Sequence, residues 1–282
     1  MIQCHDLQKS YDTREVLKGI DLDIPKGSIF GLLGPSGAGK TTLIRILTGQ
    51  IRHDGGSVKV FDKDPICLSG SDKKKFGIIM DNFGIYERFS CGENLAVYAD
   101  IYGIPHDRIQ SILKEVGLGD AYKKSASDLS KGMRARLQLA RAFIHDPEIL
   151  FLDEPTSGLD PQTMRGIHRI ILDKKNAGCT IFLTTHNREE AAKLCDNVAL
   201  LNEGEIVEEG RPEDICRKYD HQKKIKIHLS DGGDIELDRD ETAAERIGEL
   251  LRAGSLKTIH STEPTLETVF LELTGRKLEE DE

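Results

Sequence analysis

The stretch Gly34-Pro35-Ser36-Gly37-Ala38-Gly39-Lys40-Thr41 decides the fold of this chain. It satisfies the pattern Gly-x-x-x-x-Gly-Lys-[Ser/Thr] and lies between a predicted strand, Ser28–Leu33, and a helical pattern, Thr41–Leu47. The glycines let backbone N–H groups wrap phosphate oxygens, and the following helix adds the positive end of its dipole. The sequence therefore predicts a nucleotide-phosphate site, in which Lys40 reaches the β- and γ-phosphates and Thr41 ligates Mg²⁺.

A second pattern, Ile149-Leu150-Phe151-Leu152-Asp153-Glu154, places two carboxylates at the end of a predicted buried strand. Open α/β sheets bind ligands at the carboxyl ends of their strands. Because adjacent strand residues point in opposite directions, the two carboxylates should have different roles. We expect Asp153 to belong to the Mg²⁺ shell and Glu154 to polarise the attacking water. The alternative is a pair of surface acids that close a strand.

A third pattern, Leu129-Ser130-Lys131-Gly132-Met133, precedes a predicted helix over Gly132–Ile144. Ser130 is a natural N-cap, which is a purely structural role. Together with Gly132 it also offers a second anion-binding helix start, in a chain whose phosphates already have a loop. Both interpretations stay open on the residues alone.

Short apolar runs alternate with helical patterns along the chain, which predicts an α/β fold with a parallel sheet. After Ser28–Leu33, the predicted strands are Phe76–Met80, Glu148–Leu152, Thr180–Thr184 and Asn197–Leu201. The helical patterns are Thr41–Leu47, Asp107–Val116, Gly132–Ile144, Pro161–Lys175 and Arg188–Leu194. Residues from about 82 to 145 look mostly helical and interrupt the alternation of strands and helices, as an inserted helical lobe would. Ile2–Leu7 and Val16–Ile24 are expected to form a small N-terminal antiparallel sheet.

The pattern restarts after Gly210-Arg211-Pro212, which predicts two domains, 1–220 and 221–282. The second should be a small α+β module with strands and helices at Ile225–Leu229, Ile235–Leu237, Thr242–Arg252 and Thr265–Thr274. A module of roughly 60 residues is marginal alone, so we expect it to dock on the main domain or on a second copy.

Composition excludes several classes of protein. Apolar residues make up 38% and charged residues 31%, enough for a packed core under a solvated surface. The net charge of −9 argues against a nucleic-acid partner. The start of the chain lacks the basic and apolar regions of a signal peptide, and no apolar stretch is long enough for a direct membrane span. The six cysteines are scattered, as free thiols of an intracellular protein would be.

With these patterns in order, the chain resembles an ATP-binding-cassette (ABC) ATPase over about its first 210 residues. Ser157-Gly158-Leu159-Asp160 resembles the D-loop of that family, Thr184-Thr185-His186 resembles its switch histidine, and Tyr11 sits where the family stacks an aromatic ring on adenine. The resemblance implies that Glu154 and His186 are catalytic and that ATP and Mg²⁺ are the cofactors. The implied nucleotide-binding residues are Tyr11, Gly34, Pro35, Ser36, Gly37, Ala38, Gly39, Lys40, Thr41, Thr42, Ser130, Gly132 and Asp160.

One position departs from the family pattern, and one further stretch extends the resemblance. Asp81 stands after the strand Phe76–Met80, where the family usually has a Gln that contacts Mg²⁺ and senses the membrane partner. We expect Asp81 to join Thr41 and Asp153 as a metal ligand. The stretch Glu263–Leu271 resembles the tail of drug-, lipid- and antibiotic-exporter ATPases.

The sequence therefore predicts the ATPase subunit of a membrane exporter, bound to the cytoplasmic face through separate membrane-spanning permease subunits. The family resemblance implies that two copies sandwich two ATP molecules, with Ser130 and Gly132 of one copy reaching the γ-phosphate held by the other. A soluble ABC ATPase of translation or DNA repair and an importer ATPase are the alternatives.

Overall fold

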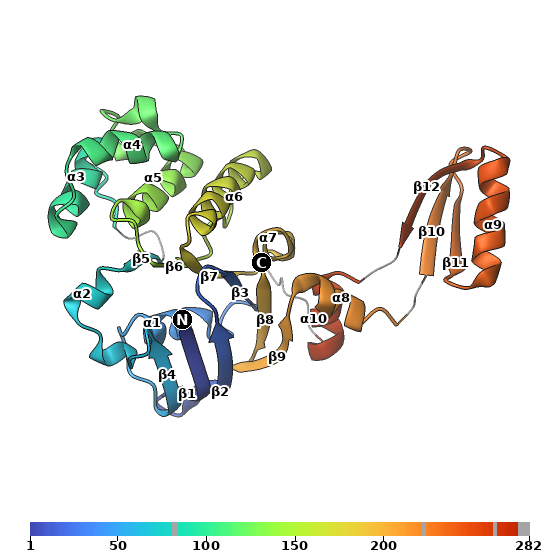
Figure 1. Ribbon diagram of the computed structural model, residues 1–282, viewed down its shortest axis with the longest axis horizontal. Coiled ribbons are helices and arrows are strands. Elements are labelled where there is room, and N and C mark those ends of the chain that lie inside the picture. The colour runs from blue at the N-terminus through green and yellow to red at the C-terminus, as the bar shows by residue number, and fades with distance from the viewer. Residues whose placement is uncertain (81–83, 222–223, 262–263, 276–282) are drawn as a thin grey trace. The chain divides into compact units, whose positions relative to one another are not determined.

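The computed structural model describes residues 1–80, 84–221, 224–261 and 264–275 (Figure 1). These residues divide into two compact units, 1–210 and 211–275. The division follows Gly210 rather than residue 220, because helix α8 (Pro212–Lys218) contacts α10 (Leu266–Thr274) within the second unit. Among the described residues, no helix combines the length and the apolar character that crossing a membrane requires.

A six-stranded sheet forms the centre of the first unit, in the order β5-β6-β7-β3-β8-β9. Its first five strands are parallel, as expected, and β9 pairs antiparallel with β8. The strands β3 and β7 are buried along their whole length, which is typical of a parallel sheet covered on both faces. The bounds are β3 Ile29–Leu33, β5 Phe76–Ile79, β6 Ile149–Asp153, β7 Thr180–Thr185, β8 Asn197–Asn202 and β9 Glu205–Gly210.

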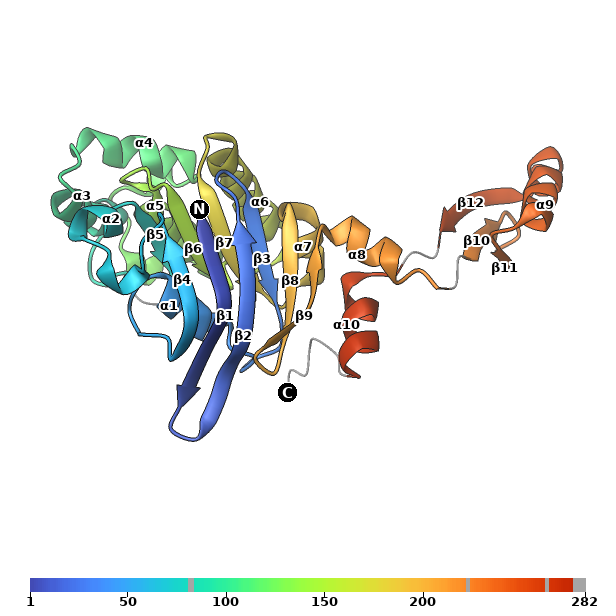
Figure 2. The ribbon, with the colours of Figure 1, turned by 60° about the horizontal axis from the view of Figure 1, so that its bottom comes forward.

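A second sheet of the first unit is antiparallel, in the order β2-β1-β4 (Figure 2). Its strands are β1 Ile2–Tyr11, β2 Arg14–Ile24 and β4 Gly55–Val60. The first two were expected from the sequence, but β4 was not. The reason is that β4 begins with two glycines and buries only Val58 and Val60, so its apolar signal is weak.

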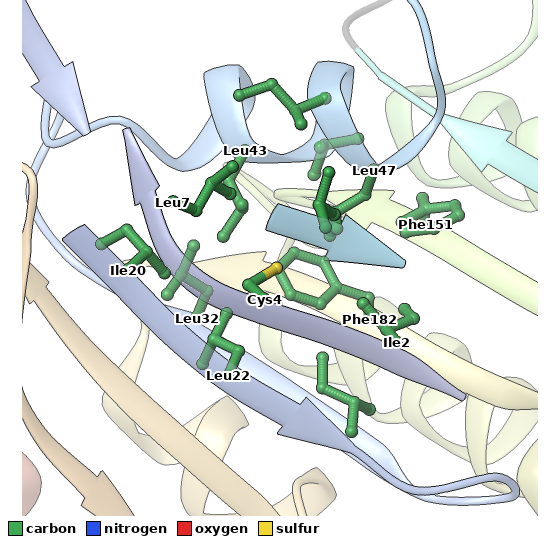
Figure 3. Close-up of a cluster of buried hydrophobic side chains, with 14 of the residues drawn as sticks. Ile2, Cys4, Leu7, Ile20, Leu22, Leu32, Leu43, Leu47, Phe151 and Phe182 are labelled. Carbon is green, nitrogen blue, oxygen red and sulfur yellow. The ribbon is translucent and has the colours of Figure 1, made fainter. Parts of the chain in front are cut away.

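The main core lies between this small sheet and one face of the central sheet, with helix α1 (Lys40–Leu47) packed between them (Figure 3). The small sheet contributes Ile2, Cys4, Leu7, Ile20 and Leu22, and α1 contributes Leu43 and Leu47. The central sheet contributes Leu32, Phe151 and Phe182. Burial of this apolar surface fixes α1, and therefore the loop before it, against the ends of the parallel strands.

Helices connect the parallel strands. The inserted stretch between β5 and β6 holds α3, α4 and α5, and the short α2 precedes β5. Helix α6 follows β6, and α7 follows β7. The bounds are α2 Gly70–Lys73, α3 Cys91–Tyr102, α4 Asp107–Glu115, α5 Lys131–Phe143, α6 Pro161–Asn176 and α7 Arg188–Leu194, with 3₁₀ turns at Pro65–Cys67, Gly119–Ala121 and Ala126–Asp128. The six cysteines are free thiols.

The second unit contains α8, α10 and a three-stranded antiparallel sheet of order β11-β10-β12. Ile227 of the central strand is buried, as are Ala243 and Leu250 of the helix α9. The strand β12 was not expected from the sequence, because it is an almost fully exposed edge strand. The bounds are β10 Lys224–Leu229, β11 Asp234–Asp238, α9 Glu241–Arg252 and β12 Leu256–Ser261.

Candidate functional site

The predicted phosphate loop joins the carboxyl end of β3 to the start of α1. Two of its glycines are required by the fold. A Cβ atom on Gly34 would clash with the carbonyl oxygen of Leu201 in the neighbouring strand β8. Gly39 has a φ of +114°, and a Cβ there would lie 2.8 Å from Leu17 Cδ2. The loop can therefore pass this close to its neighbours only with glycine at both positions.

The first turn of α1 is left open to a ligand. Its N-cap is Gly39, which offers no side-chain cap, and no acidic side chain lies in the first turn. The first N–H groups of a helix have no partner within the helix, and they attract negative charge. This helix start is therefore suited to phosphate oxygens.

Lys40 is 7% exposed and lies inside the loop. Its Nζ donates to the carbonyl oxygens of Gly34 at 2.6 Å and Pro35 at 3.2 Å. The same ammonium group lies 3.3 Å from Glu154 Oε1. One buried cation thus connects the phosphate loop to the end of β6.

The carboxylate of Asp153 receives hydroxyl groups from two other elements. Thr41 Oγ1 of α1 donates to Asp153 Oδ2 at 2.8 Å, and Thr184 Oγ1 of β7 donates to Asp153 Oδ1. Mg²⁺ is usually bound by one or two carboxylates together with hydroxyl, water and phosphate oxygens. The donor set of Thr41 and Asp153 fits that ion, whereas the described residues contain no group of three or more His, Cys, Asp or Glu that could hold a metal by itself.

Glu154 has different partners from Asp153. Its Oε2 lies 2.5 Å from Nδ1 of His186, which follows the strand β7. Burial raises the pKa of Glu154, but the contacts with His186 and Lys40 together outweigh it, so the pKa of this carboxyl lies below its ordinary value. Its backbone has a φ of +51°, a strained conformation for a non-glycine residue. The side chain is therefore an ionised carboxylate fixed between two groups that can donate protons.

Ser130, Gly132 and Asp160 gather at the starts of α5 and α6. Ser130 Oγ accepts the N–H of Met133 at 3.3 Å and caps α5. A Cβ on Gly132 would lie 2.6 Å from Thr163 Cγ2 in the first turn of α6. Asp160 caps that helix by accepting from the backbone N–H and the hydroxyl of Thr163, which lower its pKa.

Two further predicted site residues are Tyr11 and Asp81. Tyr11 ends the strand β1 with 43% of its surface exposed, and the Nζ of Lys9 lies 5.4 Å from its ring centroid. Asp81 lies outside the described residues.

The family model described as "ABC transporter" matches residues 17–157. A fluoroquinolones export ATP-binding protein of Mycobacterium tuberculosis is 40% identical over 270 residues, which cover 93% of this chain and 88% of that protein. This chain belongs to the ABC transporter family.

Further comparisons agree with this assignment. A linearmycin resistance ATP-binding protein of Bacillus subtilis is 32% identical over 99% of both chains. A methionine import ATP-binding protein of Listeria innocua is 33% identical over 99% of this chain and 85% of that protein. A solved ATP-binding subunit of an ABC transporter superposes with a TM-score of 0.69 at 26% identity, over 78% of this chain and 93% of the other. The protein is therefore an ATP-binding and ATP-hydrolysing ABC subunit.

Sequence reasoning missed some polar groups around the site of this ABC ATPase. Thr184 was included in the switch motif, but its bond to Asp153 was not expected. The signal was present, because β6 and β7 are neighbouring parallel strands whose carboxyl ends meet. Thr156, His168 and Glu190 were not assigned any role, and nothing in their sequence context marks them as a buried group.

Proposed function

We propose that this ABC ATPase is the motor subunit of an exporter that works with separate membrane-spanning permease subunits. The observation that carries the proposal is the 40% identity, over 93% of the chain, to a protein named for fluoroquinolone export. The import-type relative is less similar, at 33% identity. The exporter-like stretch Glu263–Leu271 adds support from the sequence. Binding of a permease would hold the subunit at the cytoplasmic face of the membrane.

In the reaction that we propose, the phosphate loop and Lys40 hold the ATP phosphates, with Thr42 and Tyr11 completing the nucleotide contacts. Thr41 and Asp153 would hold Mg²⁺, which neutralises charge on the phosphate oxygens when bound. Glu154 accepts a proton from the attacking water, for which its ionised state suits it. His186 keeps the Glu154 carboxylate in place through their 2.5 Å contact.

A second copy of the chain would complete the site. The starts of α5 and α6 bring Ser130, Gly132 and Asp160 together as a group. The helix start at Ser130 is a second place where a phosphate can bind. We propose that it contacts the γ-phosphate held by the phosphate loop of the other copy.

An exposed aromatic pair offers a surface for the membrane partner. Tyr86 and Phe89 are 51% and 40% exposed, and their ring centroids lie 5.3 Å apart. Buried Asn94 holds the backbone beneath them, accepting from Tyr86 N–H at 2.7 Å and donating to Tyr86 O at 3.0 Å. Rigid, exposed aromatic side chains are enriched in protein interfaces.

A pull-down from detergent-solubilised membranes tests the partner. We expect the tagged chain to recover a protein with several membrane spans, and a Tyr86→Ser/Phe89→Ser variant to recover less of it. Ile101→Ser, which changes an apolar residue of α3 that is 59% exposed, is the control. Recovery of ribosomes or repair factors instead of a membrane protein would contradict the transporter assignment.

The variant Glu154→Gln tests the catalytic role. An amide cannot accept the proton of the attacking water, so turnover should fall by about a hundredfold or more while ATP still binds. Steady-state phosphate release and equilibrium nucleotide binding measure the two effects. Turnover within about threefold of wild type would remove Glu154 from this role.

A further inference from the structure

Glu190, on the first turn of α7, has a fully buried carboxyl group that the proposed reaction does not use. Its Oε1 lies 2.7 Å from Thr156 Oγ1, which donates to it, and 3.2 Å from His168 Nε2. Thr156 is 3% exposed and His168 is 9% exposed. The three residues form a buried polar cluster, which we call the Glu190 cluster.

The Glu190 cluster joins three separate elements. Glu190 belongs to α7, His168 to α6, and Thr156 to the turn that follows β6. That turn also carries Glu154, whose carbonyl oxygen accepts the N–H of Ser157 at 3.2 Å. Residues held in such a network cannot move independently of one another.

The same helix turn is tied to His186. Asn187 follows His186 and caps α7, because its Oδ1 accepts the N–H of Glu190 at 3.1 Å. Asn187 N–H in turn donates to Thr185 Oγ1 at 2.9 Å. Glu190 is therefore bonded on both sides of the catalytic pair. Its carboxyl group accepts from Thr156 in the turn that carries Glu154, and its backbone N–H donates to Asn187, which follows His186.

The cluster is costly for stability. A buried carboxyl group loses its hydration, and such groups persist only where hydrogen bonds compensate for that loss. Here Oε1 has two partners, but Oε2 has no hydrogen-bond partner among the residues that the structure describes. A well-packed apolar group would avoid this cost, so the carboxylate is better explained by its effect on the site than by stability.

We propose that Glu190 is a positioning residue that holds Glu154 and His186 in contact. The inference rests on the proposed roles of that pair in catalysis. With the cluster intact, the turn after β6 and the start of α7 stay at a fixed separation, and the 2.5 Å contact between the two side chains is kept. Without it, the bond from Glu154 N–H to the carbonyl oxygen of Thr184 still joins the strand ends, but the turn after β6 and the first turn of α7 lose their side-chain link.

The direct test is the ring NMR signal of His186, assigned by its loss in His186→Ala. Glu154→Gln gives the position of this signal when the carboxylate that contacts His186 is removed. We expect Glu190→Ala and Thr156→Val to move the His186 signal toward that position. Thr156→Val replaces the hydroxyl group with a methyl group of similar size, so it tests the proposal even where Glu190→Ala fails to fold. An unchanged His186 signal in the folded variants would overturn the proposal.

Turnover gives a second readout. We expect Glu190→Ala to lower kcat by about tenfold or more, with the KM for ATP nearly unchanged, because a misplaced group slows chemistry without weakening binding. Added to His186→Ala, it should cause little further loss. Losses that multiply would show that Glu190 acts separately from His186 and would overturn the proposal.

A control separates positioning from general destabilisation. Ile171→Val removes one methyl group from α6, the helix that carries His168, and leaves the Glu190 cluster intact. It should lower the Tm while leaving the His186 signal in place. If His186→Ala alone keeps full turnover, the proposed catalytic role of His186 fails, and the NMR result still decides whether Glu190 positions the pair.

Discussion

Two helices of the first unit have a glycine at or beside their first residue, yet their first turns differ. Helix α1 has no side-chain cap, and the buried Lys40 and half-buried Thr41 of its first turn contact Glu154 and Asp153. Helix α5 is capped by the hydroxyl of Ser130, and its next residue, Lys131, is exposed. The first helix start is surrounded by reactive groups of its own chain, whereas at the second the Ser130 hydroxyl already accepts one of the free N–H groups, that of Met133.

The starts of α1 and α5 therefore serve different purposes. The uncapped N–H groups of α1 are stable only when an anion or water accepts from them, so this end is the primary phosphate site. The cap on α5 keeps that helix stable when no phosphate is present. Nucleotide should therefore bind a single copy through α1 and should meet α5 only when a second copy closes on it.

The largest expected effect is the difference in ATP affinity between variants of the two lysines at the helix starts. Lys40→Ala should lower the ATP affinity of the monomer by about a hundredfold, because hydrogen bonds to charged groups contribute roughly 1.5–3 kcal/mol each. Lys131→Ala is the matched control and should change the affinity by less than about twofold. Calorimetric titration with ATP measures both. Equal losses would mean that both helix starts bind nucleotide in one chain.

A smaller effect is expected from the glycines of the two starts. Gly39→Ala forces a φ of +114° on alanine beside Leu17 and the carbonyl oxygen of Val16, so it should lower the free energy of unfolding by about 2–3 kcal/mol. Gly132→Ala brings its Cβ to 2.6 Å from Thr163 Cγ2, which has to move, but its φ is not in the left-handed region and alanine favours the helix, so its cost should be smaller, about 1 kcal/mol. Urea denaturation gives both values. A larger cost at Gly132 would contradict the difference between the loops.

The smallest expected effect is on the free energy of unfolding at acidic pH. The pKa of Glu154 is lower in the folded protein than its ordinary value of 4.5. The ionised carboxylate therefore stabilises the fold at a pH above 4.5, and this stabilisation is lost as the pH falls through the lowered pKa. The difference in unfolding free energy between wild type and Glu154→Gln should therefore shrink below pH 4.5. Removal of the contact in His186→Ala should shift this loss to higher pH. A difference that is independent of pH would show that Glu154 is not held as a carboxylate.

The sequence predicted the parallel sheet well because its strands are continuous apolar runs bounded by glycine and by polar residues. It missed β4 and β12, whose residues are mostly exposed or glycine and whose pairing depends on the strands beside them. Such edge strands are specified by tertiary contacts rather than by local pattern.

For the site, the motif residues were predictable because phosphate and metal chemistry demand particular residue types at fixed spacing. The contact between Lys40 and Glu154 and the bond from Thr184 to Asp153 join elements that are far apart in the sequence. Glu190 follows another acid, Glu189, in the first turn of a helix, where acidic residues are ordinary and exposed. Only the fold reveals that Glu190 is buried and bonded to Thr156.

The most direct test of the account is the mass of Glu154→Gln with ATP in analytical ultracentrifugation, with and without Ser130→Ala. We predict a dimer for Glu154→Gln, because ATP is bound but not hydrolysed, and a monomer of unchanged ATP affinity when Ser130→Ala is added. Nucleotide-free Glu154→Gln is the control and should be monomeric. A double variant that still dimerises with ATP, or one whose monomer loses ATP affinity, would contradict the claim that the start of α5 binds phosphate only across two copies.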